Sequence, residues 1–92
     1  MNIDELKEVV KSIETITFSK HFHLRAIIRG ITEKEVLSYL RNPEALEHFE
    51  YQGEEPEGKK YVLIFNKSNK YNLKVVISNK RSFKCSNCSY TK

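Results

Sequence analysis

A chain of 92 residues can bury one modest hydrophobic core, so we expect a single domain over residues 1–92. Hydrophobic residues make up 39% of it and charged residues 30%, a balance that argues against disorder and indicates a globular protein. Sixteen Lys and Arg against twelve Asp and Glu give a net charge of +4. This balance favours anionic partners such as nucleic acid or an acidic protein, although it also arises in proteins that bind neither.

Targeting signals are not indicated at the N-terminus. Asp4 and Glu5 lie where a secretory signal needs a basic start, and no apolar run approaches the roughly 18 residues of a membrane helix. The two cysteines do not form a disulfide framework in a chain rich in Lys and Glu. We therefore expect a cytoplasmic protein without a membrane partner, and the sequence leaves open whether it is a monomer or a homodimer.

Hydrophobic periodicity predicts helices in the first part of the chain. A helix over residues 3–14, capped by Asn2 or Asp4, is indicated by four apolar residues at i, i+3, i+4 and i+7: Leu6, Val9, Val10 and Ile13. Residues 15–18 are β-branched or aromatic, which predicts a short strand or an extended link.

A second helix is predicted over residues 20–29. Ser19 can cap its start, and Gly30 lies where a left-handed C-terminal residue is expected. Four aliphatic residues share one face, which we expect to turn toward the core: Leu24, Ile27, Ile28 and Ile31.

A third helix is predicted over residues 33–41. Thr32 and Glu35 make a capping box at its start, and Pro43 prevents its continuation. After this proline the hydrophobic period changes to two, with the apolar positions Ala45, Phe49 and Tyr51, and an exposed hairpin connection follows, marked by Gly53, Pro56 and Gly58.

Besides the alternating segment with Ala45, Phe49 and Tyr51, three more segments have the character of strands. Residues 61–65 and 73–77 are apolar and should be central, joined by a polar turn over residues 66–72. A fourth, more polar strand over residues 83–90 is expected at an edge, with Phe83, Cys85 and Asn87 on one side and Lys84, Ser86, Cys88 and Tyr90 on the other. The order of elements predicts an α+β domain in which two to three N-terminal helices pack on a mainly antiparallel four-stranded sheet, leaving the other sheet face partly open.

His21, Arg25 and Arg29 are the candidate catalytic residues. Residues four apart line up along a helix, so the three form a row beside the aliphatic face. Two guanidinium groups can hold phosphate oxygens, and an imidazole can exchange protons near neutral pH, which are the two requirements of phosphodiester cleavage. In the alternative interpretation the arginines pair with carboxylates such as Glu33 or Glu35, and His21 caps a strand carbonyl.

The row also carries a resemblance. His21, Arg25, Arg29 and the Gly-Ile-Thr that follows look like the H-x-x-x-R-x-x-x-R-G-I-[ST] signature of a widespread domain-of-unknown-function family, which is related in fold to RelE, ParE and BrnT toxins. The resemblance covers roughly residues 15–80. It implies a RelE/ParE toxin-like fold, association with an antitoxin-like protein and, in RelE-like members, cleavage of mRNA without a metal or other cofactor. The last strand departs from the family's apolar ending, so Tyr90 is not carried over as a site residue.

Cys85 and Cys88 have the spacing of half a zinc site. A complete site would need His21, His23 or His48 nearby in space. The alternatives are two ordinary thiols or, less in keeping with a strand, a redox pair. We predict no metal site.

The second half of the chain interleaves aromatic residues with many cations: Lys59, Lys60, Lys67, Lys70, Lys74, Lys80, Arg81, Lys84 and Lys92. Such a surface can follow a phosphate backbone, or it can be a solvated sheet edge protected by lysines. Six glutamates divide the positive charge, so RNA should approach the side opposite to them: Glu44, Glu47, Glu50, Glu54, Glu55 and Glu57.

Two functions follow from these observations. The first is a toxin-like RNA-binding domain that acts as a metal-independent mRNA endoribonuclease of a toxin-antitoxin system, in which Arg25 and Arg29 hold phosphate and His21 moves a proton. The second is a non-catalytic interaction module of the same fold, ParE-like or antitoxin-binding.

Overall fold

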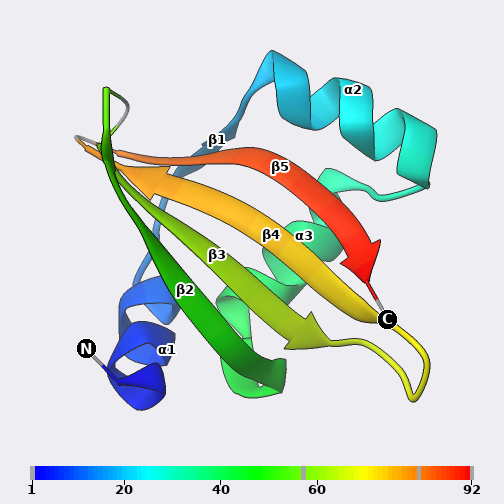
Figure 1. Cartoon of the computed structure of the whole chain (residues 1–92), viewed down its shortest axis with the longest axis horizontal. Helices are drawn as coiled ribbons and strands as arrows, with labels where there is room; N and C mark the ends of the chain where they lie inside the picture. Colours follow the sequence, from blue (N-terminus) through cyan, green and yellow to red (C-terminus); the bar gives the residue numbers. More distant parts are fainter. Residues whose placement is uncertain (1, 57, 81, 92) are drawn as a thin grey trace.

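Three helices pack on a five-stranded mixed sheet (Figure 1). The computed structural model describes residues 2–56, 58–80 and 82–91. Its elements follow in the order α1 (Ile3–Lys11), β1 (Ile16–Phe18), α2 (Lys20–Arg29), α3 (Glu33–Arg41), a 3-10 turn (Pro43–Ala45), β2 (Leu46–Glu55), β3 (Gly58–Asn66), β4 (Asn72–Asn79) and β5 (Phe83–Thr91). The predicted α+β class is confirmed. None of the helices in this part of the chain has both the length and the apolar composition to cross a membrane.

The strand order is β1-β5-β4-β3-β2. Strands β2 to β5 pair antiparallel in succession, so the prediction that residues 61–65 and 73–77 are central is confirmed. The predicted four-stranded sheet is wrong, because residues 16–18 add a fifth strand parallel to β5. For the same reason the predicted edge position of residues 83–90 is wrong: β1 covers the outer side of β5.

Helix ends follow from local capping groups. The side chain of Ser19 accepts the Phe22 N–H at 3.0 Å, and Gly30 has the left-handed φ of 67° that ends α2, so its predicted span is confirmed. The first helix ends at Lys11 rather than residue 14, because the Ser12 hydroxyl donates to the Val9 carbonyl at 2.7 Å and closes the last turn.

The third helix has its predicted span, but only half of its capping box forms. Thr32 accepts the Glu35 N–H at 3.1 Å. The Glu35 carboxylate does not return to the Thr32 N–H. Instead it accepts from the Tyr90 hydroxyl at 2.9 Å and pairs with Lys67 at 2.8 Å, which ties α3 to β5 and to the β3–β4 turn.

Helix α2 itself buries the face opposite to the predicted one: of the four aliphatic residues expected to turn toward the core, only Ile31, which follows the helix, is buried. Phe22 and Ala26 are buried, whereas Leu24, Ile27 and Ile28 are 54%, 80% and 78% exposed. The reason lies outside the helix. The Ser19 N–H donates to the Cys85 carbonyl at 3.0 Å, which fixes the start of α2 on β5, and the Phe22 ring packs against Phe18 with ring centroids 4.6 Å apart. This anchor decides which face meets the sheet.

A bulge in β5 reverses the predicted sides of its second half. The register with β4 shifts by one residue between Val76 and Ile77, opposite Ser86. One extra residue moves every later side chain to the other face. Cys88 and Tyr90 therefore join Phe83 and Cys85 on the core side, whereas Lys84, Ser86 and Asn87 lie on the opposite face.

The sheet has one covered and one open face. The core lies between the sheet and the helices, with α2 contributing Phe22 and Ala26 at the β5 side. Its largest buried side chains are Phe22, Phe65, Leu6, Leu63, Leu73 and Ile77. The other face, turned toward the viewer in Figure 1, carries no helix among the described residues, and α2 runs beside β5 at its border. We call this second side the open face.

Candidate nucleic-acid interface

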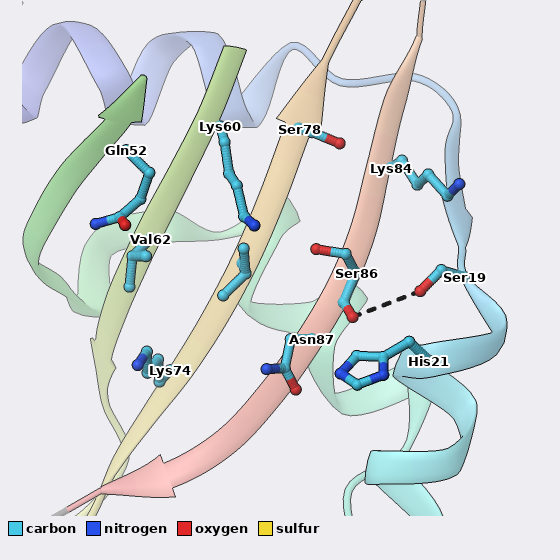
Figure 2. Close-up of a pocket in the computed structure, with 11 residues that line it drawn as sticks. Ser19, His21, Gln52, Lys60, Val62, Lys74, Ser78, Lys84, Ser86 and Asn87 are labelled. Atoms are coloured by element: carbon cyan, nitrogen blue, oxygen red, sulfur yellow. Dashed lines mark hydrogen bonds between the residues drawn. The ribbon is translucent and has the colours of Figure 1, made fainter. Parts of the chain in front are cut away.

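The open face holds a groove of about 460 Å³ (Figure 2). Three strands supply most of its floor, α2 and the residue before it form one wall, and β2 contributes from the other side. Its lining residues are Ser19, His21, Gln52, Lys60, Val62, Lys74, Val76, Ser78, Lys84, Ser86 and Asn87. We call this feature the groove.

Strand register explains why these side chains meet. Residues directly opposite each other in antiparallel strands point to the same face. Lys60 pairs with Ser78, and Ser78 pairs with Lys84, so the three form one row across β3, β4 and β5. Lys74 lies on the same face of β4, four residues before Ser78. The lysines therefore surround a floor of mixed polar and apolar side chains.

The groove is electropositive. Its eleven lining residues include three lysines and one histidine, and none is acidic. Lys60 is 3.6 Å from Glu55 at the β2 side, whereas Lys74 and Lys84 take part in none of the ion pairs between described residues. The nearest carboxylates lie instead at the β2 edge, where Glu50 is directly opposite Val62 in the strand register. An anion would therefore meet most positive charge toward β4, β5 and α2.

His21 belongs to the groove. It is the second residue of α2, and its ring lies beside Asn87 and Ser86 of β5 (Figure 2). Ser19 fixes this position, because its hydroxyl donates to the Ser86 carbonyl at 3.5 Å while also capping the helix. The imidazole is thus held at the wall of the groove by the same contacts that dock α2 on the sheet.

The two arginines of the predicted row lie elsewhere. Arg29 donates to the Cys88 carbonyl and, at 3.4 Å, to Oδ1 of Asn87, whose Oδ1 also accepts the Cys88 N–H at 2.9 Å. Its guanidinium therefore holds β5 and orients Asn87. Arg25 is exposed on α2 and does not line the groove. The structure brings only His21 of the row into the groove.

The carboxylates expected to pair with the arginines have other partners. Glu33 lies 3.4 Å from Nε2 of His23, and Glu35 pairs with Lys67. Neither Arg25 nor Arg29 is in an ion pair with a described residue. The strand carbonyl of Ser86 accepts from the Ser19 hydroxyl rather than from His21. The row is therefore not a row of structural salt bridges.

Comparison with known proteins identifies a family. The family described as "Domain of unknown function (DUF4258)" matches residues 18–84, which is more than half of the chain. The chain belongs to the DUF4258 family. No curated protein and no solved structure matches it.

The match defines which parts of the groove belong to the DUF4258 region. It includes α2 with His21 and all three lysines of the groove, Lys60, Lys74 and Lys84. It ends before Ser86 and Asn87, so the second half of β5, with its bulge, lies beyond the matched residues. The cationic and imidazole groups therefore lie within the family region.

The cysteine pair of this DUF4258 chain faces the core. Cys85 and Cys88 are both buried and free, whereas His21 lines the groove on the opposite face of β5. In the part of the chain that the structure describes, no three His, Cys, Asp or Glu side chains gather closely enough to hold a metal ion. The arrangement is that of two packed thiols.

Burial of Cys85 should make stability depend on pH. Burial raises the pKa of its thiol from 9.0 to about 12. The unfolded thiol ionises first, so this contribution is complete below pH 9 and is lost as pH rises toward 12. We expect the free energy of unfolding to fall by roughly 1.4 kcal/mol per pH unit above pH 9 from this thiol. Urea denaturation of the wild type and Cys85→Ala measures it; parallel pH slopes in the two proteins would contradict the prediction.

Most of the groove was not singled out from the sequence. Lys60, Lys74 and Lys84 were three among nine cations, of which Arg81 and Lys92 lie outside the described residues, as does Glu57 of the acidic group. Strand alternation alone could have placed Lys60 and Lys74 on the polar side of two apolar strands. It could not have placed Asn87, because the bulge in β5 breaks the alternation.

Proposed function

We propose that this DUF4258 chain is a toxin-like RNA-binding domain that cleaves RNA without a metal ion, with the RNA crossing the open face at the groove. The observation that carries the proposal is the composition of the groove, whose lining includes three lysines and a histidine but no carboxylate. Phosphate contacts from lysines supply most of the affinity of proteins for nucleic acid.

The lysines and the floor have separate roles in this proposal. Lys74 and Lys84, which have no carboxylate partner among the described residues, bind backbone phosphates on either side of Val76. The amide of Asn87, oriented by Arg29, and the hydroxyl groups of Ser78 and Ser86 offer hydrogen bonds to phosphate and ribose oxygens. Arg29 thus acts as a positioning residue.

His21 supplies the proton transfer. Its imidazole removes the proton of a ribose 2′-hydroxyl, and the 2′-oxygen forms a bond to the adjacent phosphorus. The bond from phosphorus to the 5′-oxygen breaks, and that oxygen takes a proton from solvent at the open side of the groove. The ammonium groups of Lys74 and Lys84 stabilise the negative charge that grows on the phosphoryl oxygens. The products are a 2′,3′-cyclic phosphate and a 5′-hydroxyl.

The resemblance of the helix motif to a family that is related in fold to RelE, ParE and BrnT toxins supports the same function. Helices on one face of a largely antiparallel sheet, with the opposite face free and basic, suit a domain that reads an extended polyanion. The alternative is a non-catalytic, ParE-like interaction module of the same fold, which would bind without cleaving.

RNA binding tests the interface. In Lys74→Gln/Lys84→Gln we expect a fluorescein-labelled single-stranded RNA to bind about tenfold more weakly or worse at low salt, and the salt dependence of log K to fall by roughly one to two units. Fluorescence anisotropy over a salt series measures both quantities with the same oligonucleotide.

A second pair of lysines provides the control. Lys11 and Lys34 are exposed on α1 and α3, on the covered side of the sheet, and Lys11→Gln/Lys34→Gln removes the same net charge. This variant should bind RNA within about twofold of the wild type. Equal weakening in both variants would show that RNA responds to net charge alone and that the groove is not its site.

A further inference from the structure

The outer side of α2 carries an unexplained apolar surface. At about 100° per residue, Leu24, Ile27 and Ile28 lie within one turn on the side opposite Phe22 and Ala26, which anchor the helix to the sheet. Two of the three are about four-fifths exposed. We call these three residues the outer stripe. Isolated exposed aliphatics are common, but three adjacent ones on a short helix mark an interaction surface.

Two cations accompany the outer stripe. Arg25 lies along one flank, beside His21, and Lys20 lies within the sector of the stripe in the first turn, whereas His23, 3.4 Å from Glu33, lies along the other flank. Helix α2 has no acidic residue at all. Lys20 sits at the positive end of the helix dipole, where a cation is unfavourable. A negatively charged partner would relieve this repulsion.

We propose that the outer stripe docks an acidic amphipathic helix of another protein. Its aliphatic residues would cover Leu24, Ile27 and Ile28, and its carboxylates would pair with Arg25 at the flank and with Lys20 at the N-terminal end of the stripe. This is recognition of a helix by an apolar surface bordered with complementary charge. The inference does not depend on RNA cleavage, because no residue of the outer stripe lines the groove.

Two other occupants fit less well. A second copy related by a twofold axis would place two α2 helices together, with cations facing cations. An anionic membrane also attracts basic amphipathic helices, but these insert Trp, Phe or Leu, and α2 exposes only Leu24 of these types because its one phenylalanine is buried against the sheet. An acidic helix satisfies both the apolar contact and the charge.

A synthetic stapled helix tests the proposal. The probe is about four turns long, with leucines at i, i+3, i+4 and i+7 and glutamates on both flanks. We expect it to bind the whole chain in fluorescence anisotropy, and to bind Ile27→Ser/Ile28→Ser about tenfold more weakly or worse. Arg25→Gln should also bind the probe more weakly than the wild type does, and its binding should depend less on salt.

Matched controls separate the outcomes. Tyr71→Ser removes an exposed aromatic residue elsewhere and should leave binding unchanged, and circular dichroism should give the same thermal midpoint for all variants. Equal binding of a probe with lysine flanks, or binding unaffected by Ile27→Ser/Ile28→Ser, would overturn the proposal. If the wild type is a dimer in sedimentation and Ile27→Ser/Ile28→Ser is a monomer, the outer stripe binds a second copy. If the wild type binds phosphatidylserine vesicles and this variant does not, the outer stripe binds a membrane. Either result overturns the proposal of an acidic helix.

Discussion

Replacing Phe22 with alanine should lower the free energy of unfolding by about 3 to 5 kcal/mol. The ring is fully buried and packs against Phe18 at 4.6 Å and edge-on against His23 at 5.6 Å. Removing it leaves a cavity between α2 and β5, and the aromatic contacts are lost together with the buried area. Urea denaturation followed by far-ultraviolet circular dichroism measures the change.

Ile28→Ala on the same helix is the matched control. Its side chain is 78% exposed, so we expect a change within about 0.5 kcal/mol. The comparison tests which face of α2 meets the sheet. The opposite order, with Ile28→Ala strongly destabilising and Phe22→Ala nearly neutral, would mean that the aliphatic face predicted from the sequence is buried after all.

Local signals predicted the helix boundaries well. Ser19 and Thr32 accept N–H groups three residues ahead, and Gly30 adopts the left-handed conformation that ends α2. These caps involve neighbouring residues only, so they are visible in the sequence. The capping box failed in one respect: Glu35 contacts Tyr90 and Lys67, distant partners that a local pattern does not contain.

Contacts between distant segments decided what the sequence could not. Periodicity shows that α2 has an aliphatic face, but two faces compete for the sheet, and the contact of Ser19 with Cys85 selects the one with Phe22. The pairing of residues 16–18 with β5 is likewise non-local. The β5 bulge shifts the register by one residue, which exchanged the sides predicted for Asn87 and the residues after it.

The candidate site was predicted in part. His21 was chosen from its spacing to two arginines, and it does line the groove. The two arginines have different environments: Arg29 donates a hydrogen bond to Asn87, and Arg25 borders the outer stripe. Helical spacing aligns side chains along one row but does not show which of them a neighbouring strand will engage. In our proposal the lysines of β4 and β5 take the phosphate-binding role first assigned to the arginines.

Cleavage of RNA should fall by about 10² to 10⁴-fold in His21→Ala, because a positioned general base contributes a factor of this size. The variant should still bind RNA, since Lys74 and Lys84 remain. A chelator should leave wild-type cleavage unchanged, and a 2′-deoxy oligonucleotide should bind without being cleaved, because it lacks the attacking hydroxyl. Single-turnover cleavage of end-labelled RNA on denaturing gels gives the rates and identifies the product ends.

His23→Ala separates chemistry from a general effect on α2. His23 lies two residues away, exposed and 3.4 Å from Glu33, and does not line the groove, so its replacement should change the cleavage rate by less than about threefold. Equal loss in both variants would indicate that α2 is disturbed and that His21 has no chemical role. If the wild-type protein binds RNA through Lys74 and Lys84 but does not cleave it, the proposed interface stands and the proposed nuclease activity is wrong. The imidazole at the groove wall would then lack an aligned 2′-hydroxyl.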